Sequence, residues 1–142
     1  CVGSAPIGAR GHGRPRECRP GTALHSATQV AIEAAVPGVR DLNPKGRVNK
    51  DLVIWQQPAQ TCWDDRWAVV HEPLAILEWK VFRTARQLPG FSAHDVRWLR
   101  AFSRGRSRFG GYAVWLDLER RGPRLAAGRI HQGTVDLDWL RL

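Results

Sequence analysis

Apolar residues along this chain gather in short continuous runs that are bounded by turn-forming or polar residues. One run covers residues 74–77 and extends to position 82, between Pro73 and an arginine-rich polar stretch. Another, at residues 51–55, is led by an acid. Continuous apolar runs of this length favour strands that are buried on both faces of a sheet. We therefore expect strands at 51–55 and 74–82.

Two further patterns predict helices. Residues 22–36 mix Ala, Leu, Val and Ile with helix-forming residues and end at Pro37-Gly38, which is typical of a helix C-terminus. Ser92, with Asp95 three positions later, resembles a capping box and predicts the start of a second helix. Shorter apolar stretches predict further strands at 66–70, 112–118, 125–130 and 134–140. This order predicts an α/β fold with a small mixed central sheet flanked by helices on both faces.

Length and composition limit the classes of protein to which this chain can belong. The 142 residues, 43% of them hydrophobic, suffice for a single globular domain, which we expect at residues 22–142. Residues 1–21 are rich in Gly, Pro and Arg and predict a basic arm without regular structure. No apolar stretch reaches the length of a membrane span. The three cysteines follow no metal-binding spacing, so we expect a reduced, cytoplasmic protein without a zinc site.

Positive charge is concentrated in one part of the chain. The formal net charge is +9, and residues 80–108 hold eight basic residues against the single acid Asp95. Clustered basic charge is the electrostatic footprint of a nucleic-acid-binding protein. An arginine-rich solvated surface is the alternative. On the first interpretation the phosphate backbone is held by Arg83, Arg86, Arg97, Arg100, Arg104, Arg106 and Arg108.

The tripeptide Glu78-Trp79-Lys80 closes the apolar run at residues 74–77. Strand side chains alternate between faces, so Glu78 and Lys80 point the same way. Such charges are costly inside a strand unless they are paired or bind a metal. Asp51 and Glu78 are the kind and number of ligands that Mg²⁺ or Mn²⁺ accepts, and the metal would activate a water against a phosphate. Lys80 would orient that water or stabilise the transition state. The alternative is a surface salt bridge on an edge strand.

The pattern Asp51…Glu78-x-Lys80 resembles the motif of the PD-(D/E)XK nuclease superfamily. In its phage-type and VRR-type members, a helix reading Ser-x-x-Gln-x-x-Trp-Leu follows, and then Gly and a strand. Here residues 92–99 read Ser-Ala-His-Asp-Val-Arg-Trp-Leu and are followed by glycines at 110 and 111. The resemblance covers about residues 22–118.

This resemblance implies a restriction-endonuclease-like αβββαβ core and a nuclease of phage or mobile-element type. It also implies a further acid from the first helix, for which Glu33 is the candidate. Two positions depart from the pattern. Asp95 stands where glutamine is common, and Lys50 stands where a proline often precedes the aspartate.

Seven tryptophans offer a further route to nucleic acid. Trp98 and Trp115 lie in apolar patterns and are expected to be buried. Trp63 and Trp67 lie in a polar loop, where exposed rings could stack on bases.

The leading hypothesis is therefore a metal-dependent endonuclease acting on DNA. Its site would comprise Asp51, Glu78, Lys80 and Glu33, and we expect a homodimer if it cuts both strands. A second hypothesis is a basic nucleic-acid-binding module of the same fold that does not cleave. A third is an oligomeric interaction protein that uses a Trp-rich surface.

Overall fold

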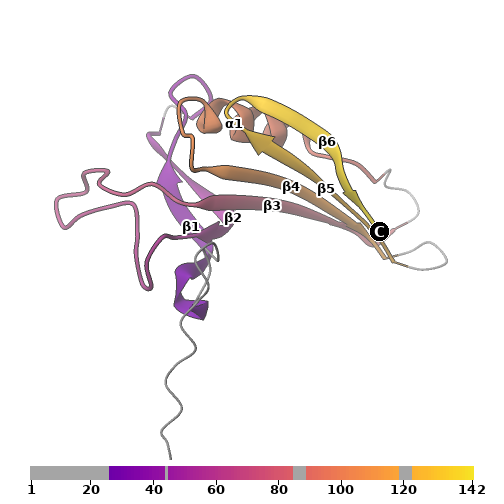
Figure 1. The fold of residues 1–142 in the computed structure, drawn as a ribbon, viewed down its shortest axis with the longest axis horizontal. Coiled ribbons are helices and arrows are strands. Elements are labelled where there is room, and N and C mark those ends of the chain that lie inside the picture. The colour runs from indigo at the N-terminus through magenta and orange to yellow at the C-terminus, as the bar shows by residue number, and fades with distance from the viewer. Residues whose placement is uncertain (1–25, 44, 85–88, 119–122) are drawn as a thin grey trace, which may run out of the picture.

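A computed structural model describes residues 26–43, 45–84, 89–118 and 123–142. Within these ranges, a six-stranded sheet in the order β1-β2-β3-β4-β5-β6 carries a single α-helix (Figure 1). In chain order the elements are the 3-10 turn η1 (Ala27–Gln29), β1 (Val30–Pro37), β2 (Arg47–Ile54), β3 (Ala75–Phe82), α1 (Ala93–Ser103), β4 (Gly110–Asp117), β5 (Arg124–His131) and β6 (Thr134–Arg141). No helix in the described ranges is long and apolar enough to cross a membrane.

The sheet is antiparallel except between β3 and β4, which pair in parallel from Ala75↔Gly110 to Phe82↔Asp117. Parallel neighbours need a crossover connection, and α1 lies in it. The pairing of β2 with β3 is much shorter, because it covers only residues 52–54 and 75–77. β2 and β3 therefore separate next to Asp51 on β2 and Glu78 on β3.

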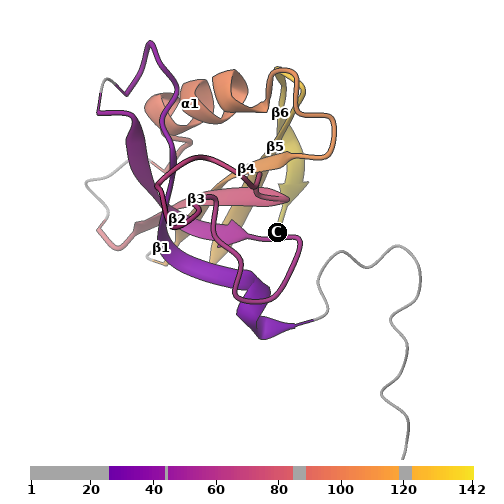
Figure 2. The same cartoon turned by 90° about the vertical axis from the view of Figure 1, so that its left-hand side faces the viewer.

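The core lies between the sheet and α1, which crosses one face of the sheet (Figure 2). Ser92 caps the helix by accepting the N–H of Asp95 at 3.3 Å. The helix buries Trp98, Leu99 and Phe102. A Cβ at Gly111 of β4 would lie 3.3 Å from the Cβ of Leu99, so glycine permits this close approach.

A change of face occurs within β1 and β2. Ala31 and Ala34 both pack against the core, although residues three apart in a regular strand point to opposite faces. Glu33 lies between them with a φ of 50°, a left-handed conformation that is uncommon for a residue other than glycine. The same change affects β2, where Val48 and Val53 both contact the core. The β1–β2 hairpin therefore turns a corner opposite position 51.

The expected fold, an α/β sheet flanked by helices on both faces with an αβββαβ core, is wrong. The sheet has six strands, α1 covers only one face, and residues 30–36 belong to β1. The spacing of Ala31 and Ala34 is that of a helix face, but it arises from the corner at Glu33. Residues 22–25 and the expected arm at 1–21 lie outside the described residues.

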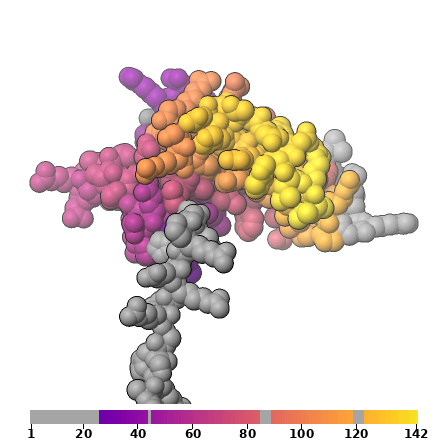
Figure 3. All heavy atoms as spheres, viewed as in Figure 1, coloured from indigo at the N-terminus to yellow at the C-terminus, as the bar shows by residue number. Residues whose placement is uncertain are grey.

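Most other expected elements are present. The strands at 74–82, 112–118, 125–130 and 134–140 correspond to β3, β4, β5 and β6, and residues 51–54 lie in β2. The helix that follows Ser92 is also confirmed. The expected strand at 66–70 is reduced to one isolated bridge, Trp63↔Val69. It lies in the connection 55–74, which projects beyond the strand ends where β3 begins (Figures 1 and 3).

Leu99→Ala should lower the free energy of unfolding by about 2–5 kcal/mol, because it opens a cavity between α1 and the sheet. Leu118→Ala is the matched control, since Leu118 is 50% exposed, and should cost less than about 1 kcal/mol. Urea unfolding of both variants checks this. Equal losses would contradict the packing of α1 on the sheet.

Candidate active site

The carboxylate of Asp51 reaches across to β3. Its Oδ2 accepts the backbone N–H of Trp79 at 2.9 Å, where the β2–β3 pairing has ended. That N–H belongs to the peptide bond that joins Glu78 to Trp79. The two acids expected to bind a metal therefore lie on neighbouring strands, and one of them is anchored to the backbone of the other.

Glu78 is 5% exposed and its carboxylate forms an ion pair with Lys50, which is 3% exposed. The ammonium of Lys50 also lies 3.8 Å from the centroid of the Trp98 ring, a cation–π contact. Trp98 in turn donates its indole N–H to the side-chain oxygen of Asn43. The buried pair thus joins β2, β3, α1 and the β1–β2 loop.

Burial raises the pKa of Glu78, because the charged carboxylate loses its hydration. Lys50 acts against this shift by a hydrogen bond and by its charge, whereas the charges of Asp51 and Asp95 add to it. The carboxyl groups of Asp51 and Asp95 therefore both lie within electrostatic reach of Glu78. A further positive charge at this place would be stabilised by all three.

Lys80 is turned toward α1. Its ammonium lies 3.4 Å from Oδ2 of Asp95, and its side chain is 48% exposed. Asp95 lies in the first turn of α1. The lysine of the motif is therefore accessible to solvent, while Lys50 occupies the buried position beside Glu78. We call Lys50, Asp51, Glu78, Lys80 and Asp95 the charged cluster.

Glu33 lies on β1 rather than on a helix, between the pairs Ile32↔Leu52 and Ala34↔Lys50. It is therefore opposite Asp51 across the hairpin, at the corner, and its side chain is exposed. This brings the backbone of the predicted supporting acid next to Asp51, although the expected helix is absent.

The predicted arginines differ in their local contacts. Arg106 is held by Glu72 at 3.0 Å and lies 4.2 Å from the Phe102 ring. Arg100 donates to the carbonyl of Gly133 at 3.0 Å. The exposed members of the predicted set are Arg83, Arg97, Arg100, Arg104 and Arg108. Arg86 lies outside the described residues.

The expectations for the tryptophans hold in part. Trp98 is fully buried and Trp67 is 69% exposed. Trp115 is half-buried and its ring packs 6.4 Å from that of Phe91. Trp63 is also half-buried and donates to the carbonyl of Ala35 at 3.4 Å.

Sequence reasoning missed the role of Lys50, which stood only as a departure from the resemblance. One signal could have pointed to it. Lysine is rare in this chain, where 3 lysines accompany 19 arginines, and two of the three lie in or next to the motif. The lysine ammonium is a compact point charge, whereas the arginine guanidinium is a planar fork, so the two are not interchangeable at such a site.

The described residues contain no group of three or more His, Cys, Asp or Glu side chains that could hold a metal. Mg²⁺ needs fewer protein ligands, because it keeps several waters and usually takes one or two carboxylates. Asp51 and Glu78 supply oxygen ligands of that kind and number. The side chains present therefore fit Mg²⁺ or Mn²⁺, with Lys50 as the cation already in contact with Glu78.

Comparisons with protein-family models, with curated proteins and with solved structures give no match for this chain. Its chemistry is therefore inferred from the charged cluster itself. Two neighbouring carboxylates, one buried and one backbone-anchored, lie beside one buried and one accessible ammonium. Oxygen ligands and positive charge together suit the binding of a metal ion and a phosphate.

Lys50→Met and Glu78→Leu should each lower the free energy of unfolding by about 3–5 kcal/mol, because each leaves an unpaired buried charge. The double variant should recover most of that loss, since both charges are then removed. A double-mutant cycle by urea unfolding measures the coupling. If the two losses simply add, the buried pair is not formed.

The raised pKa of Glu78 makes stability depend on pH. The folded protein holds this proton more tightly than the unfolded chain, whose carboxyl titrates near the ordinary value of 4.5. The resulting stabilisation is fully present below that value and is lost as pH rises through the folded pKa. Relative to Glu78→Gln, the metal-free wild type should therefore lose stability as the pH rises above about 4.5 toward neutral. A constant difference in unfolding free energy over that range would contradict the shift.

Proposed function

We propose that this protein is a metal-dependent phosphodiesterase that cleaves DNA, with Mg²⁺ or Mn²⁺ as its cofactor. One observation carries the proposal. The carboxylate of Asp51 is fixed on the Glu78–Trp79 peptide, beside a buried glutamate whose pKa is raised by burial and by neighbouring acids. A pair of carboxylates gathered in this way is destabilised by mutual repulsion unless a cation compensates it.

Asp51 and Glu78 would hold the metal. When bound, Mg²⁺ would lower the pKa of a coordinated water and stabilise negative charge on the phosphate. Asp51 is oriented by the Trp79 N–H, so its carboxylate needs little reorganisation. Glu78 is oriented by Lys50, whose charge and hydrogen bond oppose the rise in its pKa.

Lys80 would contact the scissile phosphate. Its half-exposed ammonium can reach a substrate from solvent, and Asp95 limits its range of conformations. A preorganised cation at the phosphate is worth most where negative charge develops in the transition state. Glu33, opposite Asp51, would support the metal through its position at the corner.

The net charge of +9 supports DNA as the substrate. Among the exposed arginines, Arg97 lies near the middle of α1, Arg104 is the C-cap of the same helix, and Arg83 follows β3. A homodimer would be needed to cut both strands in one encounter. We place the protein in the cytoplasm, where the free thiol of Cys62 would stay reduced.

A DNA-binding module without cleavage is the second candidate. It is favoured by the ion pair of Lys50 with Glu78, because this pair already compensates the buried charge without a metal. An oligomeric interaction protein is the third, favoured by the exposure of Trp67 in the projecting connection.

Wild-type protein should nick supercoiled plasmid in Mg²⁺ or Mn²⁺ and not in EDTA. Asp51→Asn and Lys80→Ala should each lower the rate by at least about 100-fold, since one removes a metal ligand and the other a charge at the phosphate. Asp65→Asn is the matched control, because Asp65 is an exposed acid in the connection 55–74. It should nick at the wild-type rate.

Two results would overturn this proposal. One is nicking that persists in Asp51→Asn and Lys80→Ala. The other is DNA binding without any metal-dependent nicking by the wild type, which would favour the binding module.

A further inference from the structure

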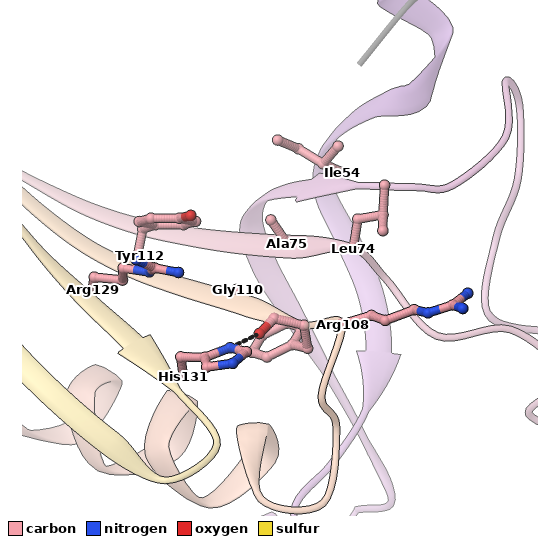
Figure 4. Close-up of a pocket in the computed structure, with 9 residues that line it drawn as sticks. Ile54, Leu74, Ala75, Arg108, Gly110, Tyr112, Arg129 and His131 are labelled. Atoms are coloured by element: carbon pink, nitrogen blue, oxygen red, sulfur yellow. Dashed lines mark hydrogen bonds between the residues drawn. The ribbon is translucent and has the colours of Figure 1, made fainter. Parts of the chain in front are cut away.

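A pocket of about 270 Å³ opens on the side of the sheet near the start of β3 and β4 (Figure 4). Ile54 and Ala75 line its apolar part, and Arg108, Tyr112, Arg129 and His131 line its polar part. Side chains alternate along β3, so Ala75 points away from the face that carries Glu78 and Lys80. The pocket is therefore separate from the charged cluster.

Tyr112 forms one wall of the pocket. Its ring lies over Gly110, where an added Cβ would be 3.1 Å from a ring carbon, so the glycine leaves the room that the ring occupies. The ring of Trp139 lies 5.3 Å from that of Tyr112. Arg129 is the register partner of Tyr112 on β5, and Figure 4 shows the two side chains next to each other. An aromatic surface and a guanidinium thus lie together.

The other wall carries Arg108 and His131. Nδ1 of His131 lies 2.9 Å from the carbonyl oxygen of Phe109. A carbonyl oxygen can only accept, so Nδ1 donates this hydrogen bond and the ring is held in place. Arg108 is exposed and extends from the rim (Figure 4). The pocket therefore has one guanidinium beside Tyr112 and a second that extends outward from its rim (Figure 4).

Trp79 extends the aromatic surface beyond the pocket. It is 61% exposed, and it pairs with Val114, two residues from Tyr112 on β4. Trp79 and Tyr112 are therefore diagonal neighbours, about 7 Å apart along the sheet, on the face away from α1. Trp79 also carries the N–H that anchors Asp51. The rings thus lie on the face of the sheet opposite Glu78 and Lys80, and only the backbone of Trp79 contacts a member of the charged cluster.

We propose that this pocket and the adjoining rings bind single-stranded DNA, with one base against Tyr112 and the neighbouring phosphates on Arg108 and Arg129. Exposed rings interleaved with arginines suit single strands, because every base has a face that can stack and every linkage has a negative charge. The cavity is slightly smaller than typical small-ligand pockets, which suits one base of a longer chain. Bases paired in a duplex cannot present their faces in this way.

The opposing charge at this surface comes from Asp136, the register partner of Arg129 on β6. Its Oδ1 accepts the N–H of Asp138 at 3.0 Å. Because this acid would repel phosphate, its removal should strengthen binding. Asp136→Asn is therefore expected to strengthen DNA binding, whereas removal of an arginine from the pocket should weaken it.

The inference shares DNA as ligand with the proposed function but needs no metal. Fluorescence anisotropy of a labelled oligothymidine with residues 1–142 in EDTA tests it. Arg129→Gln and Tyr112→Leu should each weaken single-strand binding about tenfold, and Arg108→Gln, in an exposed connection, about fivefold. Asp136→Asn should strengthen it. Arg66→Gln, an exposed arginine in the connection 55–74, should change it less than about twofold.

Binding that weakens with salt and follows this order supports the pocket, and a matching duplex should be insensitive to Tyr112→Leu. Unchanged single-strand binding in Arg129→Gln and Arg108→Gln would overturn the proposal. A second result would also overturn it: the protein sediments as a dimer, Trp139→Ser makes it monomeric, and no single-strand binding is detected. A second copy of the chain would then cover this face. Absence of nicking together with pocket-dependent binding would contradict the proposed function and leave this inference standing.

Discussion

The buried ion pair between Lys50 and Glu78, packed on Trp98, is the interaction on which the rest of the structure depends. Removing two charges from water is costly, and their attraction offsets this only where the geometry is good. The geometry here requires β2, β3 and α1 to be placed together. A pair of apolar side chains would hold the same elements together without the cost of removing charges from water. The presence of the charges therefore favours a functional reason for their burial.

The corner of the β1–β2 hairpin makes this arrangement accessible. In a regular strand, consecutive residues point to opposite faces. Here the consecutive residues Lys50 and Asp51 both reach β3, because Lys50 contacts Glu78 and Asp51 accepts the N–H of Trp79. Glu33, with a φ of 50°, lies directly opposite. Unusual backbone conformations of this kind gather at functional sites, where surrounding structure holds them. The corner and the charged cluster are thus one feature of the fold.

Some of this was predictable from sequence for physical reasons. The apolar run of β3 and the cap at Ser92 are local signals, and both predicted elements are present. The spacing of Ala31 and Ala34 misled because a strand that turns a corner buries residues with helical spacing. Lys50 was missed because its burial comes from Trp98 and Glu78, which are distant in sequence. Asp51 and Glu78 do lie together, whereas Lys80 is turned to Asp95.

Anomalous diffraction from crystals soaked in Mn²⁺ tests directly whether Asp51 and Glu78 bind a metal together. We expect one manganese peak about 2.0–2.2 Å from carboxylate oxygens of both acids, with the Lys50 ammonium moved from its contact with Glu78. A saturating soak that leaves the Lys50–Glu78 pair intact, with no manganese between the two acids, would contradict it.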